Sequence, residues 1–203
     1  MDRRTRITLL AIALVLSAVA LAPRLAAARL PGNHQGYAPE QPIAFSHRQH
    51  AGELEIQCLY CHPGAEKSRH AGIPAAQVCM NCHTVVKAPF ALVREEDKRA
   101  EEEGRKPLEI VSAELKKLFD AVDAGTPIAW VQVHRLPDFA FLDHRVHVAA
   151  GVTCQRCHGP VETMERVRQD ADLTMGWCVD CHRQPNLPGR TAPASLDCAA
   201  CHY

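Results

Sequence analysis

The sequence predicts a mostly irregular chain of short α-helices and loops, with little or no sheet, folded around covalently bound groups. Two observations support this fold class. The pattern C-x-x-C-H occurs five times in 203 residues and uses all ten cysteines. Only 5% of the residues are aromatic, which is too few for an ordinary core in a chain of this length. Fourteen prolines add frequent breaks in regular structure.

Each C-x-x-C-H motif is the attachment pattern of a c-type haem. The two thiols bind the porphyrin, and the next residue, histidine, is held where its imidazole can bind the iron. The sequence therefore predicts five covalently bound haem c groups, which we number with their motifs in chain order. The cofactor-binding cysteines are Cys58, Cys61, Cys79, Cys82, Cys154, Cys157, Cys178, Cys181, Cys198 and Cys201. The proximal iron ligands are His62, His83, His158, His182 and His202.

Zinc ribbons and structural disulfides are the alternative uses of paired cysteines. Four-cysteine zinc sites use cysteines in multiples of four, and ten cysteines do not divide in that way. Five histidines in the same register would also have no role in a zinc ribbon. Haem attachment is the interpretation that uses every residue of the pattern.

Residues 1–30 are predicted to be an export segment. Three arginines among the first six residues precede an uncharged run from Ile7 to Ala22. The run suits a cleaved signal peptide, whose apolar core has about 7–15 residues. It also lies at the short limit of a membrane anchor, which needs about 17–25 apolar residues. Either segment keeps its basic end inside and exports the rest of the chain. Residues 31–44 follow as a linker, in which His34 is interpreted as solvated.

Two stretches, residues 45–84 and 129–203, repeat the same order of motifs. In each, an H-x-x-H pair precedes two C-x-x-C-H motifs, and the second stretch carries the fifth motif in addition. The chain is therefore predicted to contain a duplicated two-haem module with a fifth, C-terminal haem. The H-x-x-H pairs are His47 with His50 and His144 with His147.

Residues 85–128, between the two modules, contain no cysteine and are predicted to be a helical insert. Its charged run from Arg94 to Arg105 is interpreted as a solvated helix or a mobile loop. Apolar residues then recur at helical spacing from Leu108 to Val122. This spacing predicts an amphipathic helix whose apolar stripe packs against the rest of the chain.

Seven histidines remain after the proximal five, and they are candidates for the sixth coordination position of each iron. The two H-x-x-H pairs are the first choice, because residues three apart lie on one side of a helical turn and can serve neighbouring haems. His134 is the predicted fifth distal ligand, since it lies in an apolar stretch outside any motif. His70 is its rival, and Met164 or Met175 is the alternative that would raise the reduction potential.

Candidate distal histidines outnumber the haems by two, so the sequence predicts irons closed on both faces. A closed iron has no open position for substrate, which indicates electron transfer and no catalytic site on this chain. The formal net charge of zero gives no argument for a nucleic-acid partner.

Several blocks of the sequence resemble the pentahaem cytochrome c subunit of bacterial alternative complex III, a quinol:electron-acceptor oxidoreductase with a multihaem, cytochrome c3/c7-like subunit. The resemblance covers most of residues 42–203. Its segments HRLPDF and CHGPVETM go beyond what haem packing dictates. The blocks are FSHRQH, CLYCHPGAEKSRHAGIPAAQVCMNCH, IAWVQVHRLPDFAFLDHRVHVAAGVTCQRCHGPVETM, LTMGWCVDCHR and CAACHY.

The resemblance implies a periplasm-facing subunit of a respiratory complex in the bacterial cytoplasmic membrane, held there by a single N-terminal anchor. The complex would oxidise quinol and pass electrons to a cytochrome c or an oxidase. The implied partners are an iron–sulfur/molybdopterin-like subunit, polytopic quinol-binding membrane subunits and a monohaem cytochrome c. Relative to this family pattern, the charged run REEDKRAEEEGR looks like an insertion.

Two other functions stay open from the sequence. A free periplasmic multihaem electron shuttle fits if the first segment is cleaved. A multihaem reductase of small nitrogen or sulfur oxyanions would require a high-spin haem with an open distal position. The excess of histidines and the absence of a variant motif such as C-x-x-C-K argue against the reductase.

Overall fold

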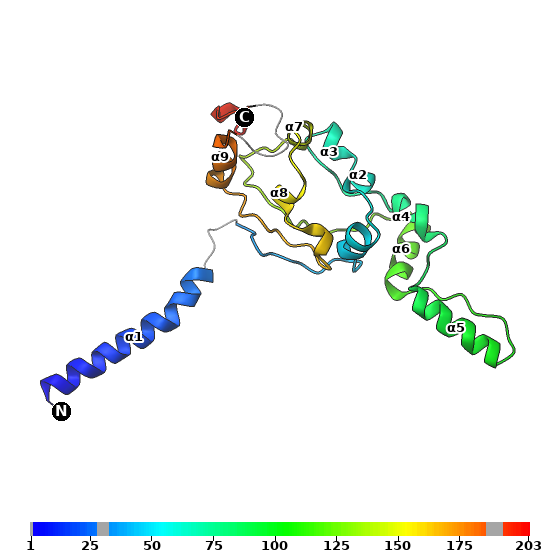
Figure 1. The fold of residues 1–203 in the computed structure, drawn as a ribbon, viewed down its shortest axis with the longest axis horizontal. Coiled ribbons are helices and arrows are strands. Elements are labelled where there is room, and N and C mark those ends of the chain that lie inside the picture. Colours follow the sequence, from blue (N-terminus) through cyan, green and yellow to red (C-terminus); the bar gives the residue numbers. More distant parts are fainter. Residues whose placement is uncertain (1, 28–32, 186–192) are drawn as a thin grey trace. The chain divides into compact units, whose positions relative to one another are not determined.

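The computed structural model describes residues 2–27, 33–185 and 193–203 (Figure 1). The chain divides into a first unit, Met1–Asn33, and a second unit, His34–Tyr203. Within the described ranges, regular structure is entirely helical and no strand is formed. This architecture confirms the fold class predicted from the motifs and the low aromatic content.

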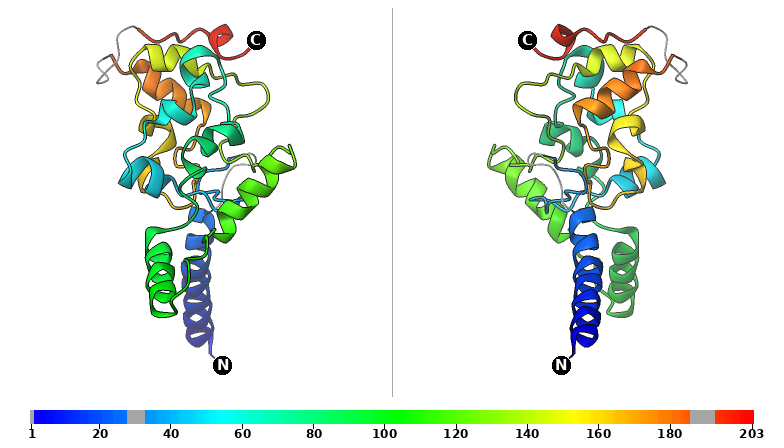
Figure 2. Two further views of the ribbon diagram at one scale, coloured as in Figure 1. Left: turned by 90° about the vertical axis from the view of Figure 1, so that its right-hand side faces the viewer. Right: turned by 90° about the vertical axis from the view of Figure 1, so that its left-hand side faces the viewer.

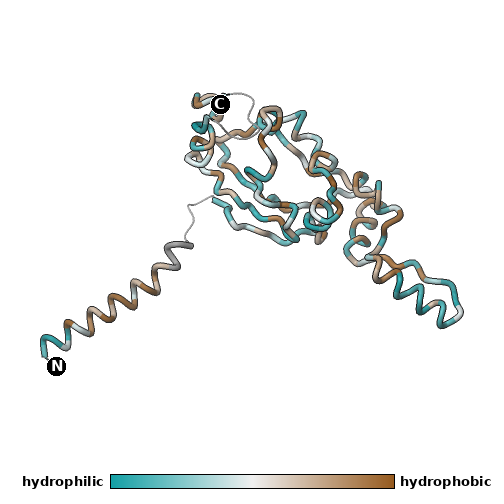
Figure 3. The backbone as a smooth tube through the Cα atoms, viewed as in Figure 1, coloured by the Kyte–Doolittle hydropathy of each residue, from teal (hydrophilic) through white to brown (hydrophobic). Residues whose placement is uncertain are grey.

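The first unit is one long helix, α1 (Arg3–Ala27). At 1.5 Å per residue its 25 residues extend over about 37 Å, which exceeds the roughly 30 Å of a bilayer's hydrocarbon core. The segment Arg3–Ala22 is long and apolar enough to cross a membrane. Figure 3 shows the apolar run along this helix. A signal sequence shares these properties, so α1 is a candidate for either role.

Short helices joined by long loops make up the second unit (Figure 2). Their bounds are η1 (Arg48–Glu53), α2 (Cys58–Cys61), α3 (Gly64–Lys67), α4 (Ala76–His83), α5 (Phe90–Glu102), α6 (Ala113–Asp123), α7 (His144–Ala149), α8 (Gln155–His158), η2 (Val161–Thr163), α9 (Met175–Arg183) and η3 (Cys198–Ala200). The buried apolar residues of the described chain are mostly small: Ala65, Ala88, Ala100, Leu118 and Met164. The polypeptide alone therefore supplies little core.

Backbone contacts join segments that are far apart in the sequence. The first contact is between η1 and η2, where Arg48 N donates to Met164 O at 2.9 Å. The second is between the loop after α3 and α7, where His144 N donates to Arg69 O at 3.3 Å. Both H-x-x-H segments are thus positioned by main-chain contacts with the other half of the second unit.

The insert contains two helices. The charged run forms most of α5, so of the two predicted forms the helix is the one adopted. The amphipathic helix begins later than the periodicity predicts: α6 starts at Ala113 because Ser112 Oγ caps it by accepting from Leu115 N at 3.3 Å. The residues from Leu108 to Ser112 form no helix or strand and lead into this cap.

Glu96, on α5, bonds to residues of the loop that follows this helix. Its side chain is 5% exposed, forms an ion pair with Arg105 and accepts from Leu108 N at 2.9 Å. Hydrogen bonds, first from Arg105 and then from Leu108 N, lower the pKa of Glu96 from 4.5 to about 2. Because the folded-state pKa is depressed, the carboxylate stabilises this segment fully above pH 4.5, and the contribution is lost as the pH falls toward 2.

Replacing Glu96 with glutamine is expected to speed amide exchange several-fold at the residues between Ala100 and Leu108, because the uncharged amide cannot form the ion pair with Arg105. Hydrogen exchange with mass spectrometry measures this change. Glu95→Gln is the matched control, since Glu95 lies on the same helix and its side chain is 65% exposed. Equal exchange in the two variants would contradict the role assigned to Glu96.

Candidate functional site

Each C-x-x-C-H motif is wound into a helical turn, which brings its two thiols and its imidazole together. The turn is closed by a bond from the histidine N to the first cysteine O in three motifs: His62 to Cys58, His158 to Cys154 and His202 to Cys198, at 2.9–3.0 Å. Side-chain caps start the turns of the fourth and fifth motifs, where Thr174 accepts from Trp177 N and Asp197 accepts from Ala199 N. The local fold therefore presents each motif as one unit.

All ten cysteines are free thiols, and none is fully buried. In the described ranges, no group of three or more histidine, cysteine, aspartate or glutamate side chains is arranged to hold a metal ion on its own. The ten thiols are therefore unpaired and at least partly accessible, as covalent attachment to a large flat group requires.

Four of the five proximal histidines form the same hydrogen bond. The Nδ1 atom of each lies 2.6–2.8 Å from a backbone carbonyl: His62 to Gly72, His83 to Val86, His182 to Ser195 and His202 to Phe139. A carbonyl can only accept, so Nδ1 carries the proton and Nε2 keeps its lone pair. This is the arrangement that orients a histidine for metal ligation through Nε2.

Three of the predicted distal histidines form this bond as well. His50 Nδ1 donates to Ser46 O, His144 Nδ1 to Arg69 O and His147 Nδ1 to Asp143 O, each at 2.8 Å. The two H-x-x-H segments therefore place imidazoles in the same tautomer as the proximal ligands. Seven rings in all have Nε2 left free to bind a metal.

Distances between ring centres test whether these histidines can share an iron. A metal–nitrogen bond of about 2 Å, with the nitrogen about 1 Å from the ring centre, gives about 6 Å between two rings on opposite faces of one iron. Three proximal–distal pairs have this separation: His83 with His50 at 6.1 Å, His158 with His144 at 6.2 Å, and His182 with His147 at 6.1 Å. The donor set thus fits haem iron closed by two histidines.

His47 lies near the first proximal ligand. Burial first, and then the nearby His62 and His50, lower the pKa of His47 to about 4. Its Nδ1 is buried without a hydrogen-bond partner, and its ring meets Phe45 edge-on at 4.8 Å. The ring is therefore held neutral, the form that binds a metal.

His134 has a different partner from the one predicted. Its Nε2 lies 3.1 Å from His158 Nδ1, and the two rings meet edge-on with centres 4.3 Å apart. The Nε2 atom that would bind an iron is thus engaged by a proximal histidine. The role of His134 as the fifth distal ligand stays a prediction, which this contact does not support. Burial lowers the pKa of both rings, that of His158 to about 4, so both are neutral near pH 7.

The remaining candidates lie in different parts of the described chain. His70 is exposed, Met175 is 68% exposed at the start of α9, and Met164 is buried beneath η1. In the described ranges the ring next to His202 is that of Phe139, at 5.9 Å. The interpretation of His34 as solvated is wrong, because its ring is half-buried against Tyr37 and its Nδ1 is buried without a hydrogen-bond partner.

Thiols of different motifs lie close enough to affect one another, and this orders the motifs in space. Burial is the main cause of a raised pKa at four thiols, and a thiol of another motif adds to it in each case. The neighbours are Cys79 and Cys82 for Cys61, Cys58 for Cys154, Cys181 and Cys178 for Cys157, and Cys201 for Cys178. The spatial order of the motifs is therefore second, first, third, fourth, fifth.

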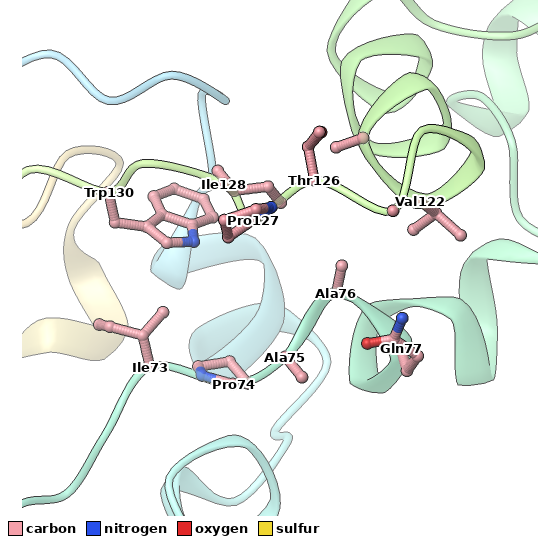
Figure 4. A pocket seen from close by; sticks show the side chains of 12 residues that line it. Ile73, Pro74, Ala75, Ala76, Gln77, Val122, Thr126, Pro127, Ile128 and Trp130 are labelled. Atoms are coloured by element: carbon pink, nitrogen blue, oxygen red, sulfur yellow. The ribbon is translucent and has the colours of Figure 1, made fainter.

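A cleft of about 430 Å³ lies between the start of α4, the end of α6 and Trp130 (Figure 4). Ile73, Pro74 and Val122 are among the residues that line it, and no charged residue does. Such walls suit packing against an apolar group and not the binding of a charged substrate.

Comparison with known proteins agrees with the donor set. Residues 140–203 match the family described as cytochrome c7 and related cytochrome c. The chain is also 25% identical over 183 residues to the menaquinone reductase multihaem cytochrome c subunit of Nitratidesulfovibrio vulgaris strain Hildenborough. That alignment covers 80% of this chain and 77% of the relative. These similarities to multihaem cytochromes agree with the five C-x-x-C-H motifs and indicate covalently bound haem c and a role in electron transfer.

Proposed function

We propose that the chain carries five haems and relays electrons as a subunit of a membrane quinol-oxidising complex. The observation that supports this most directly is the set of three imidazole pairs with centres 6.1–6.2 Å apart. Irons closed in this way bind no substrate, so they serve electron transfer and not catalysis. When bound, each haem supplies a one-electron couple, and the protein sets its exposure and potential.

The ten cysteines hold the five haems, and the five motif histidines are the proximal ligands. We assign His50, His144 and His147 as distal ligands opposite His83, His158 and His182. His47 is assigned to His62, the proximal histidine that most affects it. Each H-x-x-H pair then serves two neighbouring haems, the first and second or the third and fourth.

The order of the thiols supports a linear relay. Neighbouring motifs in the order second, first, third, fourth, fifth place the second and fifth haems at the two ends. Cys58 and Cys154 lie close enough for Cys58 to raise the pKa of Cys154, so their motifs join the two halves of the relay. Electrons enter at one end and leave at the other, and each partner docks near an end haem.

The quinone link comes from the similar proteins. The relative is named as a subunit of a menaquinone reductase, and the resemblance to alternative complex III implies a quinol oxidoreductase. Helix α1 is apolar enough to anchor the chain, which would place the haem unit in the periplasm. The proposed partners are an iron–sulfur/molybdopterin-like subunit, polytopic quinol-binding subunits, and a monohaem cytochrome c or an oxidase. No catalytic site is proposed on this chain.

Gentle detergent extraction of native membranes, purification through this chain and mass spectrometry test the proposal. We expect polytopic subunits and an iron–sulfur protein to co-purify, with residues 1–30 intact. The pyridine haemochrome assay should give five haems per chain. A lone protein that begins near Arg29 would favour a free periplasmic shuttle, and a high-spin haem in that protein would favour a reductase.

A further inference from the structure

His158 is the exception among the proximal histidines. The other four donate from Nδ1 to a backbone carbonyl, whereas His158 Nδ1 faces His134 Nε2 at 3.1 Å. The ring of His144 lies nearly parallel to that of His158, with centres 6.2 Å apart and planes 16° apart. The Nε2 of His158 is thus available to an iron shared with His144, while its Nδ1–H points at a second imidazole.

These roles determine the proton positions on both rings. If His158 ligates through Nε2, its Nδ1 must carry the proton and donate it. His134 Nε2 then accepts and cannot ligate an iron at the same time. His134 is half-buried, and its backbone carbonyl accepts from Gln132 Nε2 at 3.0 Å.

An imidazole nitrogen is a stronger base than a peptide carbonyl oxygen. An acceptor on Nδ1 makes the proximal ligand more basic, and a more basic ligand stabilises oxidised iron. We propose that His134 is a positioning residue that orients His158 and lowers the reduction potential of the third haem. This inference rests on the proposed ligation of that haem by His158 and His144.

The effect would act at the centre of the relay. The third motif lies between the first and the fourth in the spatial order derived from the thiols. Its proximal ligand is also the ring that His134, His144, His62 and His47 approach together. A lower reduction potential at the third haem would create a difference in potential where electrons pass between the two pairs of haems that the H-x-x-H segments serve.

The test replaces His134 with leucine, which removes the acceptor at similar volume, and with glutamine, whose carbonyl can accept. Spectropotentiometric titration of the haem-loaded protein should show one midpoint raised in His134→Leu, with the spin state of every haem unchanged. The expected size is about tenfold in the reduction equilibrium constant, or about 59 mV for one electron. His134→Gln should recover part of the shift. His70→Gln, at an exposed histidine, is the matched control and should change no midpoint.

Two results would overturn the proposal. A high-spin haem in His134→Leu would make His134 an axial ligand, and unchanged midpoints would leave it no role in tuning. Neither result would affect the haem count that tests the proposed function. If the variants fail to load haem, nitrogen-15 NMR of the reduced wild-type protein tests the hydrogen bond between His158 and His134 directly. Coupling across the hydrogen bond between the His158 and His134 nitrogens is expected, and its absence would contradict the assignment.

Discussion

Replacing His144 with alanine is expected to convert one haem to the high-spin state and leave the spin state of the other four unchanged. The ring of His144 lies 6.2 Å from that of His158, the separation of two imidazoles on one iron, so its loss opens the distal face of that iron. His147→Ala should convert a different haem, the one at His182, because His147 lies 6.1 Å from that ring. Electron paramagnetic resonance and the high-spin absorption band measure the fraction converted.

The two histidines lie on one short helix, so each variant is a matched control for the other. If they serve different irons, the double variant should contain twice the high-spin haem of either single variant. If they compete for one iron, the double variant should contain no more than a single variant. His70→Ala, at an exposed histidine, should leave the spin state of every haem as in the wild type. All haems low-spin in both single variants would show that the ligand assignment is wrong.

The sequence alone could predict those parts of the site that depend on residues close together in the chain. Two cysteines and a histidine in five residues form one helical turn, so the attachment units could be identified without a structure. The H-x-x-H spacing likewise places His144 and His147 on the same side of a turn. In both cases the chemistry depends on neighbours within a few residues.

The pairing of imidazoles across an iron depends on long-range contacts, and spacing does not encode them. His144 faces His158 because its Nδ1 and its backbone N both donate to Arg69 O, an atom distant in the chain. His134 lies in an apolar stretch, as expected for a buried ligand, and only the structure shows His158 as its partner. The low aromatic content predicted a small core, but not that His34 would lie against Tyr37.

Replacing Gly52 with alanine should destabilise the haem unit, even though glycine is not required there by its backbone angles. A Cβ atom at this position would lie 2.2 Å from Glu162 O, a main-chain atom of η2. Either η1 or η2 must then move, and η1 carries His50, which faces His83. Overpacking of this kind costs about 1–3 kcal/mol, so thermal unfolding monitored at the Soret band should begin several degrees lower. The second haem should also gain high-spin character.

Gly176→Ala is the control for Gly52→Ala. It shows whether any glycine-to-alanine change in a helix destabilises the protein, or only one that meets a neighbouring backbone atom. Gly176 lies in α9, and a Cβ atom there would meet nothing nearer than Thr174 Oγ1 at 3.9 Å. Alanine is favoured over glycine inside a helix by about 1 kcal/mol, so this variant should be as stable as the wild type or more so. A Gly52→Ala protein with wild-type stability and an unchanged second haem would mean that η1 and η2 are not in backbone contact. Because that contact positions His50 opposite His83, the assignment of the second haem's distal ligand would then have to be revised with it.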